Sequence, residues 1–154
     1  MSLKERIDSD LKQAMKARDK PRLDCLRMLK SKILEQEKAS RGDEAAAPLT
    51  DEETQAVVTT YAKQRRDSIT SYREGGREDL ARQEEAELAI VGEYLPRQLS
   101  EEEVRKIVAE AIEESGASSP RDLGAVMKLA MPRVKGAADG KQVNRIAREL
   151  IAGD

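Results

Sequence analysis

Tryptophan, phenylalanine and histidine are absent from this 154-residue sequence, and its aromatic residues are three tyrosines. Without histidine, the chain has neither a Ser-His-Asp triad nor a histidine ligand for zinc. Without phenylalanine and tryptophan, it lacks two of the side chains on which proteins stack nucleic-acid bases. These absences remove much of the common catalytic repertoire.

Cysteine is almost as scarce, because Cys25 stands alone and no internal disulfide can form. It lies beside Leu26 and close to Leu29 in a helical pattern, where a free cysteine usually packs as a small hydrophobic residue. The alternative is a reactive thiol, which requires a lowered pKa. The pattern favours packing.

Long apolar runs are also missing. No stretch approaches the roughly 20 residues that cross a bilayer, and Met1 to Arg6 lack the apolar region of a signal peptide. Charged and apolar residues each make up 38% of the chain, a balance typical of helical proteins with wide solvated faces. We therefore expect a soluble, cytoplasmic protein that does not enter a membrane.

Apolar residues recur every three or four positions along almost the whole chain, and no stretch alternates as a half-buried strand does. This periodicity predicts an all-α protein, with about four helices in an N-terminal domain, 1–95, and three in a small tail domain, 96–154. Pro96 marks the boundary because its ring blocks helix continuation. Gly75-Gly76 predicts a reversal between the third and fourth helices. The small and polar residues 39–49 predict an irregular, exposed loop.

Capping signals delimit the helices of the tail. Ser100 with Glu103 predicts a capping box at the start of its first helix, and Asp139 with Gln142 predicts a cap at the start of its last. Pro132 is expected to limit the length of the helix between them. Three short helices with tight turns indicate one small bundle.

Charged residues interrupt two apolar stripes of the N-terminal domain. Arg65 falls within the stripe of the third helix, and Glu84 falls within that of the fourth. If these helices fold back at the two glycines, residues equally far from the turn face one another. The spacing therefore predicts a structural ion pair of Arg65 with Glu84 or Glu87.

Acidic clusters at residues 84–87 and 101–103 raise the question of a metal site or an acid–base pair. Acidic residues in a first helical turn favour the helix dipole, and a lone acidic helix face is usually solvated. We expect neither a metal nor a cofactor. Gly75-Gly76 does not predict a phosphate-binding loop, since the Gly-Lys-Ser/Thr that should follow is missing.

Charge is unevenly distributed along a chain whose formal net charge is −2. Residues 78–114 carry 12 acidic against 4 basic residues, whereas residues 120–154 carry 7 basic against 4 acidic residues. In the last predicted helix, basic residues recur at four- and three-residue steps on one face. The candidate RNA- or partner-binding residues of the tail are Lys128, Arg133, Lys135, Lys141, Arg145 and Arg148.

Two interpretations of these basic residues remain open. They form either an ordinary solvated surface or a surface that contacts nucleic acid. Without phenylalanine or tryptophan, we expect nucleic-acid contacts to run through phosphates and RNA shape rather than stacked bases. Such binding should be weak and steeply salt-dependent.

Several blocks of the sequence resemble the YqeY family, whose C-terminal part is similar to the tail of the GatB subunit of tRNA-dependent amidotransferase. The resemblance covers nearly the whole chain. Its most specific blocks are Lys63-Gln64-Arg65-Arg66-Asp67-Ser68-Ile69, Tyr94-Leu95-Pro96-Arg97-Gln98-Leu99-Ser100, and shorter stretches within residues 76–81, 124–127 and 136–140. It implies an N-terminal helical domain joined to a three-helix tail, and the relative of that tail in the amidotransferase touches tRNA.

Two functions of different classes follow. The first is a non-catalytic adaptor or binding protein, linked through its tail to tRNA or to a protein of the translation or amidotransferase machinery. The alternative is a carbon–nitrogen ligase with glutamine as amido-N-donor, a label that the family often carries, or an accessory subunit of such an enzyme. That chemistry needs an ATP-binding catalytic domain and a glutaminase, neither of which the sequence indicates, so we expect no such activity from the isolated chain. An enzyme needs a pocket with convergent polar groups, whereas an adaptor needs only a shaped surface.

Overall fold

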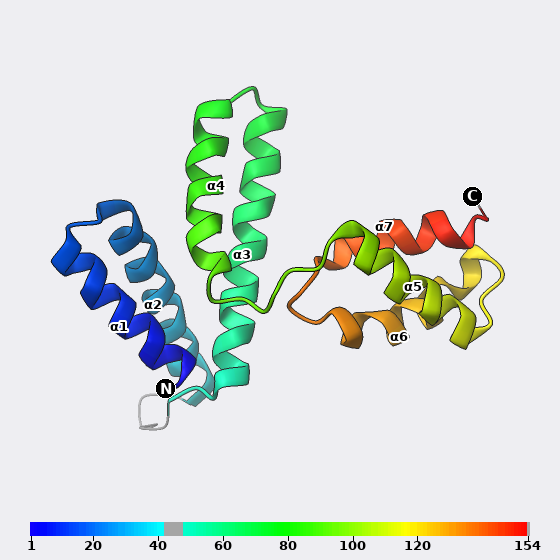
Figure 1. The fold of residues 1–154 in the computed structure, drawn as a ribbon, viewed down its shortest axis with the longest axis horizontal. Coiled ribbons are helices and arrows are strands. Elements are labelled where there is room, and N and C mark those ends of the chain that lie inside the picture. Colours follow the sequence, from blue (N-terminus) through cyan, green and yellow to red (C-terminus); the bar gives the residue numbers. More distant parts are fainter. Residues whose placement is uncertain (42–47, 154) are drawn as a thin grey trace. The chain divides into compact units, whose positions relative to one another are not determined.

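A computed structural model describes residues 1–41 and 48–153 of the chain. Every regular element in these ranges is helical and none is a strand, so the predicted all-α class is confirmed (Figure 1). None of the described helices is long and apolar enough to span a bilayer. The chain divides into two compact units, Met1–Leu95 and Pro96–Asp154, each with its own hydrophobic core. The elements are α1 (Leu3–Ala17), α2 (Lys20–Arg41), α3 (Asp51–Glu74), α4 (Glu78–Gly92), α5 (Glu101–Ser115), the 3-10 turn η1 (Pro120–Asp122), α6 (Leu123–Val134) and α7 (Gly140–Ile151).

Local signals in the sequence set where several helices begin. Ser2 and Thr50 each form a capping box at the start of α1 and α3. At α3, the Glu53 N–H donates to Thr50 Oγ1 at 3.2 Å, and the Thr50 N–H donates to Glu53 Oε2 at 2.7 Å. These reciprocal bonds satisfy backbone groups that a first helical turn leaves free, so α3 begins at Asp51.

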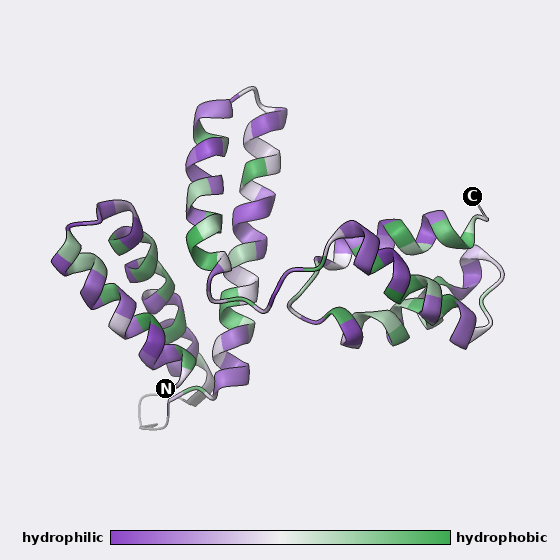
Figure 2. Ribbon diagram, viewed as in Figure 1, coloured by the Kyte–Doolittle hydropathy of each residue, from purple (hydrophilic) through white to green (hydrophobic). Residues whose placement is uncertain are grey.

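The core of the N-terminal unit is built from the apolar faces of α1 to α4. Leu26, Leu29 and Ile33 of α2 are almost completely buried, as are Val58 of α3 and Val91 of α4. Hydrophobic and hydrophilic residues alternate along these helices, as the 3.6-residue period of an amphipathic helix requires (Figure 2). Each such side chain contributes about 1.5–3 kcal/mol when it leaves water.

Helices α3 and α4 form an antiparallel hairpin whose reversal lies at Gly75-Gly76, as predicted (Figure 1). Gly76 has a φ of 74°, in the left-handed region that favours glycine. The Arg77 N–H donates to the Tyr72 carbonyl at 2.7 Å, which closes the end of α3. This turn brings the charged residues of the two helices onto facing surfaces.

The C-terminal unit packs α5, α6 and α7 around an aliphatic core. Ser100 caps α5 with Glu103, as predicted, and Gly116, at a φ of 71°, ends that helix. The Leu99 N–H donates to the Ala137 carbonyl at 2.8 Å, which fastens the approach to α5 to the turn before α7. The buried core residues are Val104, Val108, Ala111, Val126, Ala130, Val134, Val143, Ile146 and Ala147.

The irregular loop predicted for residues 39–49 begins later in the structure than expected. Helix α2 continues through Arg41, so residues 39–41 are helical and do not belong to the expected loop. Adding residues to an existing helix costs little, and alanine and arginine are among the best helix formers. Residues 42–47 of the expected loop lie outside the described ranges, whereas Pro48 and Leu49 are not helical.

Of two expectations for the tail, one agrees with the structure and one needs correction. Pro132 lies inside α6, and this helix ends two residues later at Val134, in line with the expected limit on its length. A proline so near the end of a helix removes a single backbone hydrogen bond, and the complete burial of Val134 offsets that loss. At α7, the Asp139 carboxylate accepts from the Lys141 N–H at 3.1 Å, and no reciprocal bond from Gln142 accompanies it among the described residues.

Candidate partner-binding site

The six basic residues selected from the sequence all lie at exposed positions of the C-terminal unit. They are Lys128 and Arg133 on α6, Lys135 directly after α6, and Lys141, Arg145 and Arg148 on α7. The faces of α6 and α7 that pack into the core of the unit are apolar, so the charged residues of these helices lie on their outer faces.

Helix α7 is amphipathic, which fixes where its cations point. Val143, Ile146 and Ala147 are completely buried against α5 and α6. At 100° per residue, Lys141, Arg145 and Arg148 fall on the opposite face. In the structure all three of these cations are exposed.

Arg145 is held by acidic residues rather than left free. Its guanidinium lies 3.0 Å from Glu101 Oε1, at the start of α5, and 2.9 Å from Glu149 Oε1, one turn further along α7. Arg105 completes a four-residue network, with Nη2 2.6 Å from Glu149 Oε2 and 3.4 Å from Glu101 Oε1. Hydrogen bonds from Arg145 lower the pKa of Glu101, and hydrogen bonds from Arg105 lower the pKa of Glu149. The network is exposed, so it orients side chains more than it stabilises the fold.

The remaining basic residues differ in how they are paired. Arg133 forms an ion pair with Glu114 of α5. Lys135 and Lys141 also interact within the chain. Within residues 1–41 and 48–153, Lys128 and Arg148 form no ion pair or hydrogen bond through their side chains, so their charges are the most available to a partner.

Sequence reasoning missed the second role of the acidic first turn of α5. The sequence assigns Glu101 to the helix dipole, and its place in that turn agrees with this. It also accepts from Arg145 and Arg105. The signal in the sequence is weak, since Glu101 and Arg145 are 44 residues apart.

The N-terminal unit contains a second cluster of charged side chains. Arg65 Nη1 of α3 lies 3.1 Å from Glu84 Oε2 and 3.7 Å from Glu87 Oε2, both on α4. All three side chains are less than one third exposed. The Arg65 guanidinium also lies 4.9 Å from the centre of the Tyr61 ring, within the range of a cation–π interaction. The structure thus places the three residues of the predicted ion pair together.

Two further groups surround this cluster. The Tyr61 hydroxyl donates to Glu87 Oε1 at 2.8 Å, and the Cys25 thiol lies 3.8 Å from the Glu87 carbonyl oxygen. Burial, reinforced by the hydrogen bond to Glu87, raises the pKa of Tyr61. Burial also raises the pKa of the Cys25 thiol to about 12. Both groups therefore stay protonated at neutral pH, and the packing role predicted for Cys25 agrees with its burial.

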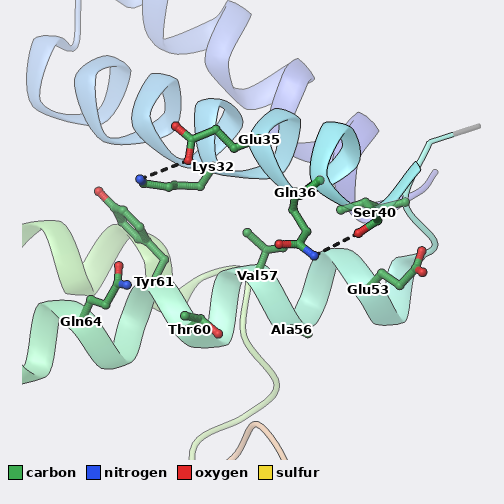
Figure 3. Close-up of a pocket in the computed structure, with 12 residues that line it drawn as sticks. Lys32, Glu35, Gln36, Ser40, Glu53, Ala56, Val57, Thr60, Tyr61 and Gln64 are labelled. Atoms are coloured by element: carbon green, nitrogen blue, oxygen red, sulfur yellow. Dashed lines mark hydrogen bonds and ion pairs between the residues drawn. The ribbon is translucent and has the colours of Figure 1, made fainter. Parts of the chain in front are cut away.

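A cavity of about 530 Å³ opens between α2 and α3 (Figure 3). Its polar wall residues on α2 bond to one another: Lys32 Nζ lies 3.3 Å from Glu35 Oε2, and Gln36 Nε2 lies 3.0 Å from Ser40 Oγ. Tyr61 enters the wall from α3, with its hydroxyl committed to Glu87. The wall is thus a mixture of apolar and polar side chains, and four of the polar ones on α2 are paired with one another.

The described residues include no group of three or more histidine, cysteine, aspartate or glutamate side chains arranged to hold a metal ion. The cavity, the paired charges of the α3–α4 hairpin and the exposed basic residues of α6 and α7 are thus the features open to a functional interpretation. They lie in a small all-α protein of two units.

The family model described as "Yqey-like protein" matches residues 4–151, and the chain therefore belongs to that family. A curated relative, "Altered inheritance of mitochondria protein 41, mitochondrial" from Pyrenophora tritici-repentis (strain Pt-1C-BFP), is 30% identical over 153 residues. The match covers 95% of this chain and 79% of the relative. The relative's name describes that protein as mitochondrial; a cytoplasmic location stays a prediction for this chain.

Proposed function

We propose that this protein is a non-catalytic binding protein, or adaptor, that contacts RNA through the exposed cations of its C-terminal unit, with tRNA as the first candidate. One observation carries the proposal: the side chains of Lys128 and Arg148 are exposed and make no hydrogen bond or ion pair with any described residue. Both lie in residues 120–154, a segment with three more basic than acidic residues. A cation without a partner can bind a phosphate at no cost in broken ion pairs.

The chemistry of such binding follows from these side chains. Lysine binds a phosphate as a point charge, whereas the arginine fork donates two parallel hydrogen bonds to it. A few interactions of this kind, without a deep groove, give modest affinity that falls steeply as salt increases. The protein would then act by tethering RNA rather than by chemical change.

Acidic residues restrict where phosphate can approach. Glu101 and Glu149 neutralise Arg145, and Glu114 neutralises Arg133. Phosphate must displace a carboxylate to reach either arginine, which reduces the net gain. We therefore centre the RNA-binding surface on Lys128 and Arg148, with Lys141 and the two paired arginines contributing less.

The family supports an RNA-linked role in a limited way. The tail resembles the tail of GatB, the subunit of an enzyme that acts on tRNA. A protein of the translation or amidotransferase machinery would bind the same tail through the same charges, and the test below separates it from RNA.

The decisive measurement is a salt titration of tRNA binding by fluorescence anisotropy. We expect the triple variant Lys128→Gln, Lys141→Gln and Arg148→Gln to bind more weakly, by a similar factor for different tRNA sequences. The slope of log affinity against log salt should flatten by about 0.7–0.9 for each phosphate that the variant no longer neutralises, or roughly 2–3 in all. Circular dichroism should show both proteins equally helical.

A matched control removes the same charge elsewhere. Arg73, Arg77 and Arg82 are exposed and lie around the α3–α4 reversal, where they pair with neighbouring acidic residues. Their replacement by glutamine should leave the slope nearly unchanged, because binding depends on the position of the cations rather than on net charge. Absence of tRNA binding by the wild-type chain at low salt, or equal losses of affinity in the two triple variants, would reject the proposal and favour a protein partner.

A further inference from the structure

A cavity of about 370 Å³ lies at one end of the C-terminal unit, where the start of α6 meets the end of α7. It is lined by Pro120 of η1, Leu123 of α6, and Arg148 and Ile151 of α7. Three of its four lining residues are therefore apolar, and the fourth, Arg148, is the one charged residue among them. Its volume falls in the range of roughly 300–1,000 Å³ typical of small-molecule sites.

Arg148 differs from Arg145, its neighbour on the same face of α7. Arg145 is paired with two glutamates, whereas Arg148 has no side-chain hydrogen bond or ion pair within the part of the chain that the structure describes. None of the four lining residues is acidic, so nothing in the cavity wall competes for the guanidinium. The cavity therefore offers an unpaired cation beside an apolar surface.

These walls select for one kind of occupant. A small free anion would use the guanidinium but leave the apolar walls unfilled, and a purely aliphatic group would leave the cation unpaired. A flat heteroaromatic ring satisfies both, because its face stacks on a guanidinium plane and packs against aliphatic side chains. If that ring is a base of an RNA, the phosphates of the RNA are attracted to residues 120–154, whose net charge is +3.

We propose that this cavity holds one unpaired nucleobase of the bound RNA, stacked on Arg148 and packed against the apolar side chains of Pro120, Leu123 and Ile151. The inference rests on the proposed RNA-binding function and specifies the nucleotide that it recognises. It changes the expectation that RNA is bound through phosphates alone. Arginine planes stack unpaired bases in RNA complexes, and apolar side chains pack on base faces without any aromatic residue.

The test compares RNAs that differ only in one base. Two hairpins of equal length carry a single bulged nucleotide, which is a uridine in one and abasic in the other, so the number of phosphates is the same. We expect the full-length chain to bind the base-bearing hairpin roughly 5-fold more tightly, in line with the loss of one stacked base. Both hairpins should show the same salt slope, because their phosphates are equal in number and position.

A pair of matched substitutions locates the base. Ile151→Ala removes one wall of the cavity and should abolish the discrimination between the hairpins. Ile107→Ala, at a partly buried position of α5 that does not line the cavity, should preserve it. Thermal denaturation by circular dichroism reports whether both variants remain folded.

The outcomes separate this inference from the function on which it rests. Equal, salt-dependent binding of both hairpins by the wild-type chain would overturn the nucleobase site and leave the RNA-binding proposal standing. Discrimination that survives Ile151→Ala in a folded protein would also overturn it. Absence of binding to either hairpin and to tRNA at low salt would overturn both.

Discussion

The two units of this protein use charge in opposite ways. The N-terminal unit places Arg65, Glu84 and Glu87 at the α3–α4 interface, where they are mostly covered and pair with one another. The C-terminal unit has an aliphatic core and keeps the arginines and lysines of α6 and α7 exposed. Charged side chains buried between two helices make it costly to separate them from their partners. Charged side chains outside an apolar core remain available to bind other molecules.

This difference teaches where stability and binding should reside. A covered ion pair loses most when one partner is removed, because the other is left desolvated. An exposed cation over an aliphatic core is replaced at little cost to the fold. Substitutions in the α3–α4 cluster should therefore change stability, and substitutions of exposed cations on α6 and α7 should change binding.

The largest expected effect tests the aliphatic core of the C-terminal unit. Ile146 is completely buried among α5, α6 and α7. Ile146→Ala should lower the free energy of unfolding of this unit by roughly 2–5 kcal/mol, through reduced burial and the cavity left behind. Urea denaturation followed by circular dichroism measures the change. Lys106→Ala, at an exposed position of α5 in the same unit, is the control and should cost far less; equal losses of stability would show that this core is not the main source of the unit's stability.

The second prediction concerns the covered charges of the N-terminal unit. Arg65→Ala should destabilise it by about 2 kcal/mol, between the 3–5 kcal/mol of a fully buried pair and the 0–1 kcal/mol of an exposed one. Glu84 Oε2 lies within ion-pair distance of Arg65 Nη1, but neither it nor Arg65 Nε makes a hydrogen bond among the described residues, which keeps the value below the upper figure. Thermal melting measures it, with Arg82→Ala, whose side chain is 76% exposed, as the control. A double-mutant cycle with Glu84→Ala should give a coupling energy well above zero; an Arg65→Ala protein that melts like wild type would refute the ion pair.

The smallest expected effect is a pH dependence in the N-terminal unit. A hydrogen bond from Arg22 lowers the pKa of Glu93 in the folded state, with Nη1 2.6 Å from Glu93 Oε2. Because the pKa of Glu93 is lower in the folded than in the unfolded chain, its carboxylate stabilises the fold fully at pH values above the unfolded pKa, near 4.5. This stabilisation is lost as the pH falls through the pKa of the folded state. Because Glu93 is 46% exposed, screening limits the contribution to about 0.5 kcal/mol. Glu93→Gln should therefore melt slightly below wild type at pH 7, and this difference should shrink as the pH falls below 4.5; a difference that does not change with pH would contradict the linkage.

Much of the fold follows from signals that act within one or two helical turns. The capping boxes at Thr50 and Ser100 and the reversal at Gly75-Gly76 satisfy backbone groups locally, so the sequence specifies them without reference to other helices. The position of Arg65 relative to Glu84 needed only one further assumption, a tight antiparallel turn. Pro132 limits the length of α6 but does not specify its last residue, because the helix continues to Val134, whose burial is a tertiary effect.

The sequence by itself determined that this chain forms amphipathic helices, where most of them begin, and which cations stay outside the core. Only the tertiary structure decided which of those cations are neutralised, because Arg145 and Glu101 meet across 44 residues. It also decided that Arg148 borders a cavity with Leu123 and Ile151. Periodicity and capping are set by neighbours along one helix, whereas a pairing or a cavity depends on how three helices pack, a geometry that no local pattern encodes.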